Sequence, residues 1–383
     1  MKKERLFSLD VLRGLDMFYL AVASGVLSQV FRATGAPEGF AKFFCSHPWG
    51  GFTLYDLIMP LFIFMCGAAV PLALKSRTTE DGAPTAAFHR HVWFRFAMLW
   101  ALGLLAQGNL QQWRWDMILP YSNTLQTIAV GYVVTAYVLL VKNWAFRIAV
   151  PAVLALIYGL VVHFGGDYTP YGNVTMPFER WVLSFVFPPE HHAITILNEG
   201  GWYWYTWFLP SLMFSVISLC GAFSTLIITG DALRFGANRP TERAIALAIF
   251  GAGMLGAGWF AELVLGVDCV KQIFTVSFTF QAIGWSILAL ALLYVLCDVL
   301  KIRRGWWLFT LFGQSALFVY VMKSIFAGSL YRFTERFFDQ NAMDAWVAKS
   351  WQGCVRELLV GTLLIVMVVL WQQRKGGKVT RPA

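Results

Sequence analysis

Charged side chains are scarce in this sequence. Asp, Glu, Lys and Arg make up 13% of its 383 residues, whereas a soluble domain carries about 25%. So little charge excludes an ordinary water-soluble domain. The net charge of +9 is not evidence for nucleic-acid binding either, because in such a chain the placement of the charges matters more than their sum. No nucleic-acid partner is expected.

Motifs for several kinds of chemistry are missing. The chain has no GxxxxGK[ST] phosphate loop, no GxSxG nucleophile elbow and no HExxH zinc helix. ATP-driven transport, serine hydrolysis and zinc chemistry therefore have no support from motifs. The six cysteines show no CxxC spacing, which argues against a zinc site and against a disulfide scaffold. No metal is expected.

Long apolar runs are what the sequence has in abundance. Hydrophobic residues make up 58% of the chain, and the mean hydropathy is +0.60. A helix needs about 20 apolar residues to cross a bilayer, and its backbone groups must bond within the helix. We predict an all-α polytopic membrane protein, a single transmembrane domain over 1–383 with about 10 (10–11) helices. The expected spans are roughly 8–30, 53–74, 93–110, 120–141, 146–164, 206–229, 244–267, 274–299, 306–327 and 354–372.

The distribution of Lys and Arg predicts the orientation of these spans. With a cytoplasmic N-terminus, 19 of the 30 Lys and Arg residues fall in inside segments and 10 in outside ones. This asymmetry follows the positive-inside rule, so both termini are predicted to be cytoplasmic. Two long outer loops are expected at about 165–205 and 328–353, and loops of such length often act as lids or binding surfaces.

A histidine and an aspartate lie at the start of the second expected span, in HPWGGFTLYD. The pKa of imidazole suits proton transfer near neutrality, and a neighbouring carboxylate fixes its tautomer. His47 and Asp56 are therefore candidates for a catalytic pair at the outer lip. The alternative is a solvated loop histidine beside an aspartate that caps the span.

Three charges interrupt the first span. Asp10 and Arg13 are three residues apart on one helix face, and Asp16 continues that face, so an ion pair is expected. Charges inside a span usually face the bundle interior or a cavity. Either the pair is structural, with Arg13 reaching the interface, or Arg13 and other inner cations bind an anionic ligand.

Polar residues also enter two later spans from the outer side. Asn123 and Gln126 recur at helical spacing in YSNTLQTIAVGY, and Lys271 and Gln281 lie in or beside the outer half of span 274–299. Such side chains either join helices to one another or line a polar cavity. Glu199, in the aromatic-rich outer loop, is a further candidate for contact with a ligand.

Four stretches taken together resemble one family. They are RLFSLDVLRGLDMFYL, HPWGGFTLYDLIMPLFIFMCG, YSNTLQTIAVGY and VSFTFQAIGWSILALALLYVLCDVL. Their joint pattern and order resemble the bacterial relatives of heparan-alpha-glucosaminide N-acetyltransferase, the NagX-like proteins, over most of the chain.

The resemblance implies a membrane-embedded acetyltransferase. Such an enzyme takes acetyl from cytoplasmic acetyl-CoA, its co-substrate, and gives it to an amino sugar or other carbohydrate acceptor on the outer side. The family's catalytic histidine corresponds to His47, with one residue fewer than usual before Trp49, and Asp56 ends that motif. A frequent family asparagine corresponds to Ser24. The resemblance also implies a multi-pass protein of the bacterial inner membrane and a homodimer in the lipid bilayer.

The expected reaction assigns roles to the polar residues. His47 would act as base or as acetyl carrier, and Asp56 would orient its ring. The residues expected to bind acetyl-CoA at an inner cationic mouth are Arg13, Asp10, Arg90, Arg95 and Arg303. The residues expected to bind the acceptor are Trp49, Ser24, Asn123, Gln126, Glu199, Trp202, Lys271 and Gln281.

Two other functions stay open at this point. One is a transporter or permease for sugars or their derivatives, although the internal repeats typical of transporters are not evident in the sequence. The other is a non-catalytic membrane partner protein. Dependence on acetyl-CoA distinguishes the enzyme from both alternatives, and sugar uptake identifies the transporter.

Overall fold

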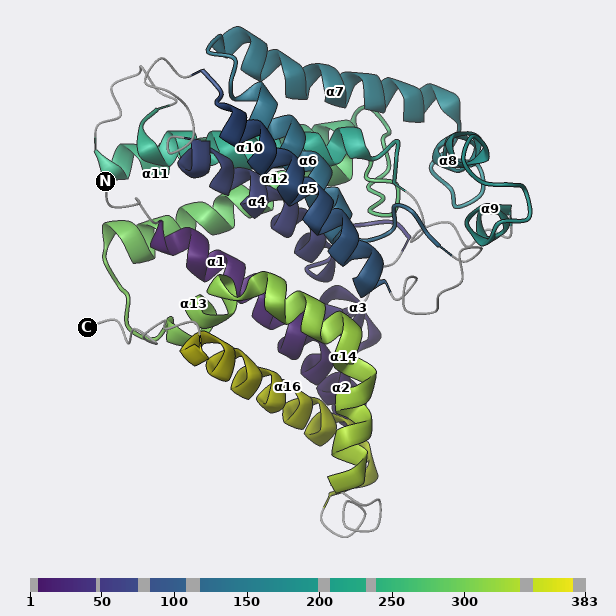
Figure 1. The fold of residues 1–383 in the computed structure, drawn as a ribbon, viewed down its shortest axis with the longest axis vertical. Helices are drawn as coiled ribbons and strands as arrows, with labels where there is room; N and C mark the ends of the chain where they lie inside the picture. The colour runs from purple at the N-terminus through teal and green to yellow at the C-terminus, as the bar shows by residue number, and fades with distance from the viewer. Residues whose placement is uncertain are drawn as a thin grey trace.

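All regular elements of the protein are helices in the part of the chain that the structure describes (Figure 1). The structure is a computed structural model, which describes residues 6–45, 49–74, 83–107, 118–198, 207–231, 239–337 and 347–374. The helices are α1 (Phe7–Phe18), π-helical η1 (Tyr19–Ala23), α2 (Ser24–Thr34), α3 (Glu38–Cys45), 3₁₀-helical η2 (Tyr55–Leu57), α4 (Ile58–Leu74), α5 (Ala86–Ala106), α6 (Thr124–Val138), α7 (Trp144–Gly165), α8 (Thr175–Ser184), α9 (His192–Asn198), α10 (Ser211–Thr229), α11 (Pro240–Leu263), α12 (Val276–Leu293), π-helical η5 (Tyr294–Val299), α13 (Trp307–Gln314), α14 (Ala316–Phe337) and α16 (Lys349–Arg374).

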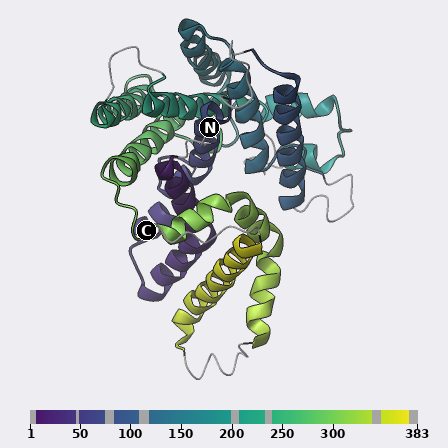
Figure 2. The ribbon, with the colours of Figure 1, turned by 60° about the vertical axis from the view of Figure 1, so that its left-hand side comes forward.

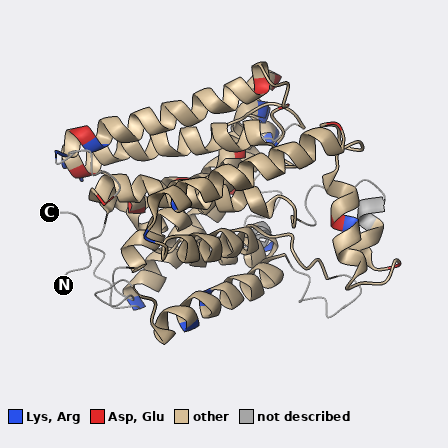
Figure 3. Ribbon diagram, turned by 90° about the horizontal axis from the view of Figure 1, so that it is seen from above, with Lys and Arg blue, Asp and Glu red and all other residues tan. Residues whose placement is uncertain are grey.

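Seven of the helical segments are long and apolar enough to cross a membrane, and a bent pair, α13 with α14, makes an eighth. The expected polytopic helical membrane protein is confirmed at this level, and Figure 3 shows long stretches of these helices without charged residues. The expected count of ten stays a prediction. Two expected spans correspond to α5, which carries charges in its first half, and to α6, which is shorter than a full span.

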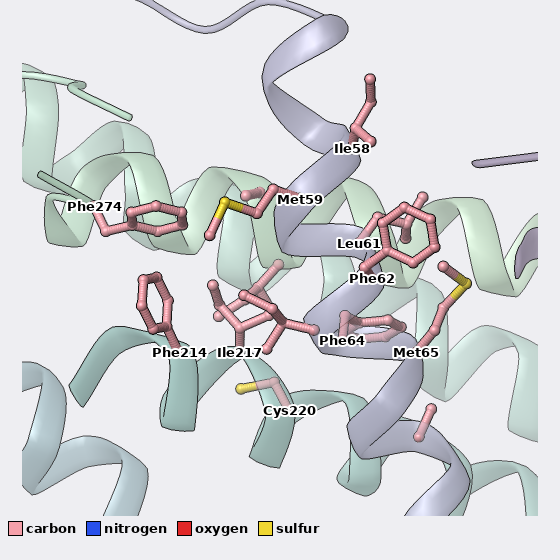
Figure 4. Close-up of a cluster of buried hydrophobic side chains, with 14 of the residues drawn as sticks. Ile58, Met59, Leu61, Phe62, Phe64, Met65, Phe214, Ile217, Cys220 and Phe274 are labelled. Carbon is pink, nitrogen blue, oxygen red and sulfur yellow. The ribbon is translucent and has the colours of Figure 1, made fainter. Parts of the chain in front are cut away.

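The centre of the fold is formed by α4 and α10, with α6 and α12 beside them (Figure 1). Thirteen of the 17 residues of α4 are buried, as expected for a helix that is apolar on all sides. Figure 4 shows Met59 and Phe64 of α4 beside Phe214 and Ile217 of α10. Because α4 is packed on all sides, the residues at its two ends are held in position.

A second group of helices consists of α1, α2, α13, α14 and α16. Figures 1 and 2 show α14 and α16 side by side, and α2 packs along α16. The first turn of α1 and the last turn of α16 lie on the same side of the bundle, opposite α3, α8 and α9 (Figure 1). The helices α1 and α13 approach closely, because each has a glycine at the contact, Gly14 and Gly313.

Several expected spans are not continuous α-helices, since η2 begins the span 53–74 and η5 ends the span 274–299. Two further spans are interrupted within their length. The first is interrupted by η1, a π-helical turn of a kind often found at functional sites. The segment expected over 306–327 is a bent pair, because α13 ends at Gln314 and α14 begins at Ala316 with a bend of 75°. Backbone breaks at membrane depth are tolerated where they are buried in protein or line a cavity.

The two expected outer loops contain helices. Helices α8 and α9 lie within 165–205. Helix α14 continues to Phe337, so the first residues of the expected loop 328–353 are helical rather than irregular.

Candidate functional site

The segment that follows the expected catalytic histidine is attached to three other parts of the protein. We call residues 49–54 the lip loop. The Leu54 N–H donates to the Phe43 carbonyl of α3 at 3.1 Å, and the Gly51 N–H donates to the Cys269 carbonyl at 2.9 Å. The Trp49 indole N–H donates to the Tyr168 carbonyl at 2.8 Å. These bonds hold the lip loop at the start of α4. His47 itself lies outside the described residues.

Asp56 is buried and has two neighbours that bind its carboxylate. Oδ2 accepts hydrogen bonds from the Thr53 backbone N–H at 3.0 Å and the Thr53 hydroxyl at 2.6 Å. Oδ1 lies 3.0 Å from the ammonium of Lys271. The Asp56 and Lys271 side chains are only 1% and 7% exposed. The Lys271 ammonium also lies 5.5 Å from the centre of the Tyr55 ring, so the pair is enclosed by protein.

The segment between α11 and α12 presents Lys271 to this carboxylate. The Phe274 N–H donates to the Lys271 carbonyl at 2.9 Å, and Phe274 adopts a φ of 47° to close that turn. The Thr275 hydroxyl oxygen accepts from the Val270 N–H at 3.0 Å. Burial lowers the pKa of the Lys271 ammonium, and the Asp56 carboxylate acts in the opposite direction. Lys271, expected at the acceptor site, is thus engaged with Asp56.

Ser24 lies next to the end of α3. Its hydroxyl donates to the Leu20 carbonyl in the same helix at 3.3 Å, and the Cys45 thiol lies 3.8 Å from the Ser24 carbonyl. Lys323 of α14 donates to the same Leu20 carbonyl. Sequence reasoning did not choose Lys323 as a site residue, although a lysine in the apolar run LFVYVMKSIFAG is the signal that identifies it.

A cavity of about 550 Å³ lies between α1, α4, α5, α6, α13 and α14. Its volume is in the range of small-molecule sites, about 300–1,000 Å³. The break between α13 and α14 lies against it. We call this space the bundle cavity, and its lining residues are Arg13, Met17, Phe62, Met65, Cys66, Ala69, His91, Phe94, Arg95, Met98, Leu99, Thr124, Leu125, Ile128, Gly313, Gln314, Ala316, Leu317 and Tyr320.

Two of the arginines expected to bind acetyl-CoA line the bundle cavity. Arg13 pairs with Asp10 at 3.4 Å, as the sequence spacing predicted. Arg95 lies 4.5 Å from the centre of the Tyr132 ring, and its Nη2 lies 3.5 Å from the Cys66 sulfur. The other two are elsewhere. Arg90 is exposed and outside the lining, and Arg303 lies 5.5 Å from the Phe7 ring.

Asn123 and Gln126 cap the start of α6. The Asn123 side-chain oxygen accepts from the Leu125 N–H at 2.9 Å, and the Gln126 side-chain oxygen accepts from the Ser122 and Asn123 N–H groups, each at 2.9 Å. Together these hydrogen bonds form a capping box. The Tyr320 hydroxyl, at the cavity wall, donates to Asn123 at 3.2 Å. The contact of Asn123 and Gln126 with the acceptor stays a prediction. Much of the hydrogen-bonding capacity of these two side chains is used by the backbone groups that they cap.

Asn123→Ala is expected to lower the free energy of unfolding by about 1 kcal/mol for the lost cap, and more because the Tyr320 hydroxyl loses one of its hydrogen-bond partners. Asn143→Ala is the matched control. Asn143 caps α7 by accepting from the Ala145 N–H at 2.8 Å at an exposed site. Titration of both variants with SDS in mixed micelles measures the two losses. Equal losses would show that the Tyr320 bond adds nothing.

The remaining expected acceptor residues are not gathered at one place. The side-chain amide of Gln281 in α12 donates a hydrogen bond to the carboxylate of Glu262 in α11 at 2.5 Å. This bond links the two helices. Trp49 is in the lip loop. Glu199 and Trp202 lie outside the described residues.

Metal ligation has no candidate among the described residues, because no three His, Cys, Asp or Glu side chains are grouped there. No protein-family model matches the chain, and a search of curated proteins returns no match.

Proposed function

We propose that this protein is a membrane-embedded acetyltransferase that moves acetyl from cytoplasmic acetyl-CoA to an amino sugar or other carbohydrate on the outer side. The observation that supports the proposal best is the bundle cavity, which combines Arg13 and Arg95 with a mostly apolar wall. The proposed setting is the bacterial inner membrane, with ten spans, both termini in the cytoplasm and two chains per assembly. The resemblance of four sequence stretches to the NagX-like proteins supports the same activity.

The cations of the bundle cavity fit the donor. Acetyl-CoA carries several phosphate charges, and arginine binds phosphate through paired N–H groups. Arg95 has no carboxylate within ion-pair distance among the described residues, so an anionic ligand would supply the missing partner. The apolar wall, including Met17 and Phe62, suits the pantetheine arm. We propose that the arm lies along α4 and directs the thioester toward the lip loop.

The chemistry needs one base. The acceptor amine attacks the carbonyl carbon of the thioester, the carbon–sulfur bond breaks, and the CoA thiolate takes up a proton. His47 removes the proton from the amine, or first accepts the acetyl group on its ring and passes it on. An acceptor hydroxyl would react in the same way to give an ester. Both routes place His47 at the reacting atoms.

Asp56 and Lys271 have a positioning role in this proposal. Their ion pair joins the start of α4 to the segment before α12, and Asp56 binds Thr53 in the lip loop. Held in this way, the lip loop keeps a fixed position at the start of α4, and small errors in the position of catalytic groups cost large factors in rate. That Asp56 also orients the ring of His47 stays a prediction.

His47→Ala is expected to abolish acetyl transfer while leaving acetyl-CoA binding intact, because the base is lost and the cavity cations remain. The measurement uses purified protein in detergent, labelled acetyl-CoA and a panel of hexosamines, with His163→Ala as control. His163 is an exposed histidine that bonds the Tyr168 hydroxyl at 2.9 Å. Label transfer by His47→Ala at the wild-type rate would refute the role of His47, and absence of acetyl-CoA binding to wild type would refute the enzyme.

A sugar transporter is the second candidate. The bend of 75° between α13 and α14 favours it, because broken helices at membrane depth often surround transport sites. Uptake of labelled sugar by proteoliposomes, without acetyl-CoA, distinguishes this candidate from the acetyltransferase.

A further inference from the structure

The bundle cavity has an apolar rim at the surface of the protein. Phe94 of α5, which lines the cavity, is 67% exposed, and Met98 and Leu317 are also exposed. Helices α5 and α14 do meet farther along, where Tyr320 packs against the cluster that contains Leu99. The rim therefore lies between α5 and the α13–α14 bend. In a membrane protein, exposed apolar side chains of this kind face the hydrocarbon of the bilayer.

The interior behind this rim is cationic. Arg95 is half-buried, and it contacts the Cys66 sulfur and the Tyr132 ring rather than a carboxylate of the described residues. Arg13 shares the cavity and is paired with Asp10, and His91 also lines it. Among the described residues, the cavity lining thus contains two guanidinium groups and no carboxylate. Charge at membrane depth is costly unless it is paired, so the cavity has the electrostatics of an anion site.

We propose that the bundle cavity binds an anionic phospholipid from the surrounding bilayer. The headgroup phosphate lies on Arg95 and Arg13, and one acyl chain leaves the cavity between Phe94 and Leu317. The inference does not depend on the proposed acetyltransferase activity. It has a consequence for that activity, because a lipid phosphate and the phosphates of acetyl-CoA would use the same arginines and exclude each other.

A lipid fits the cavity better than a small soluble anion does. Most of the lining is apolar, from Met17 and Met65 to Leu125 and Ile128, and a small anion would leave that wall without a partner. An acyl chain covers it and continues through the rim into lipid. The charged groups and the apolar wall are therefore both satisfied by one amphiphilic molecule.

The test measures lipid retention without any acyl donor. The protein is reconstituted in nanodiscs of phosphatidylglycerol and phosphatidylcholine with identical chains in equal amounts, extracted into detergent, and its retained lipids are counted by native mass spectrometry. Wild type is expected to retain phosphatidylglycerol in preference to phosphatidylcholine. Arg95→Gln is expected to lower that preference about fivefold, the effect of one arginine near an anionic headgroup. Leu317→Trp, which fills the rim, is expected to lower retention of both lipids.

Arg90→Gln is the matched control, because Arg90 is exposed on the same helix and does not line the cavity. Its lipid preference should equal that of wild type. Equal retention of the two lipids by wild type would overturn the proposal, as would a loss in Arg90→Gln as large as in Arg95→Gln. Unchanged retention in Leu317→Trp would overturn entry through the rim. If Arg95→Gln does not fold, Arg95→Lys keeps the charge and should keep the preference. Failure of acetyl transfer would affect none of these results.

Discussion

Lys271→Met is expected to lower the free energy of unfolding by about 3–5 kcal/mol, because it leaves the Asp56 carboxylate buried without its cation. Asp56 is fully buried, and Lys271 is the cation 3.0 Å from its Oδ1. The hydrogen bonds from Thr53 remain, but they do not neutralise the charge. Titration with SDS in mixed micelles, followed by tryptophan fluorescence, measures the loss.

The double variant Asp56→Asn with Lys271→Met should recover much of this stability, because replacing both members of a buried pair removes the uncompensated charge. Lys42→Met is the matched control. Lys42 pairs with Glu38 at 2.8 Å, but these side chains are 56% and 82% exposed, and exposed pairs contribute little. A loss in Lys271→Met no larger than in Lys42→Met would contradict the importance of the buried pair.

This result also bears on the proposed reaction. If the double variant is folded but transfers acetyl slowly, with an unchanged affinity for acetyl-CoA, the pair positions the lip loop for catalysis. If the folded double variant transfers acetyl at the wild-type rate, the pair serves stability alone.

Gly14→Val is expected to prevent normal packing of α1 on α13. A Cβ atom at Gly14 would lie 1.6 Å from the Phe309 carbonyl oxygen, and one at Gly313 would lie 2.1 Å from the Asp10 carbonyl oxygen. Both obstacles are backbone, so the helices themselves must separate. We expect a loss of about 3 kcal/mol or more in the free energy of unfolding, at the upper end of the range for overpacking, measured by the same SDS titration.

The same substitution should also disturb the bundle cavity, because its neighbour Arg13 and the opposing Gly313 both line it. Gly253→Val is the matched control, since nothing lies within 4 Å of a Cβ built on Gly253 of α11. The control should keep wild-type stability and lipid retention. Equal effects of the two substitutions would show that the close approach of α1 and α13 is not required.

Much of the architecture was predictable from the sequence, because long apolar segments must become helices in a bilayer. The pairing of Asp10 with Arg13 was also predictable, since their spacing places them on one helix face. The bend at Ser315 was not predicted. Residues 306–327 were expected as one span, and the structure divides them at Ser315, where α13 packs against α1 and α14 turns away.

The candidate site was only partly predictable. Arg13 and Arg95 were chosen for their charge, and the structure brings both to one cavity. Arg90 precedes Arg95 on the same helix, and nothing in the sequence showed which of the two arginines lines the cavity. Lys271 was expected at the acceptor site, and its pairing with Asp56 joins residues 215 positions apart. Such pairs are formed by packing and leave no trace in local spacing.

The sequence by itself determined that this is a helical membrane protein and which polar residues its spans contain, because the lack of charge and the length of the apolar runs leave few alternatives. Only the tertiary structure decided which of these residues meet. Helix periodicity specifies the face on which a side chain lies, but the neighbour of that face depends on how the helices cross. In this protein the crossings rely on close contacts at glycines such as Gly14 and Gly67, and the contact of α1 with α13 brings Arg13 and Gly313 together in the wall of the bundle cavity.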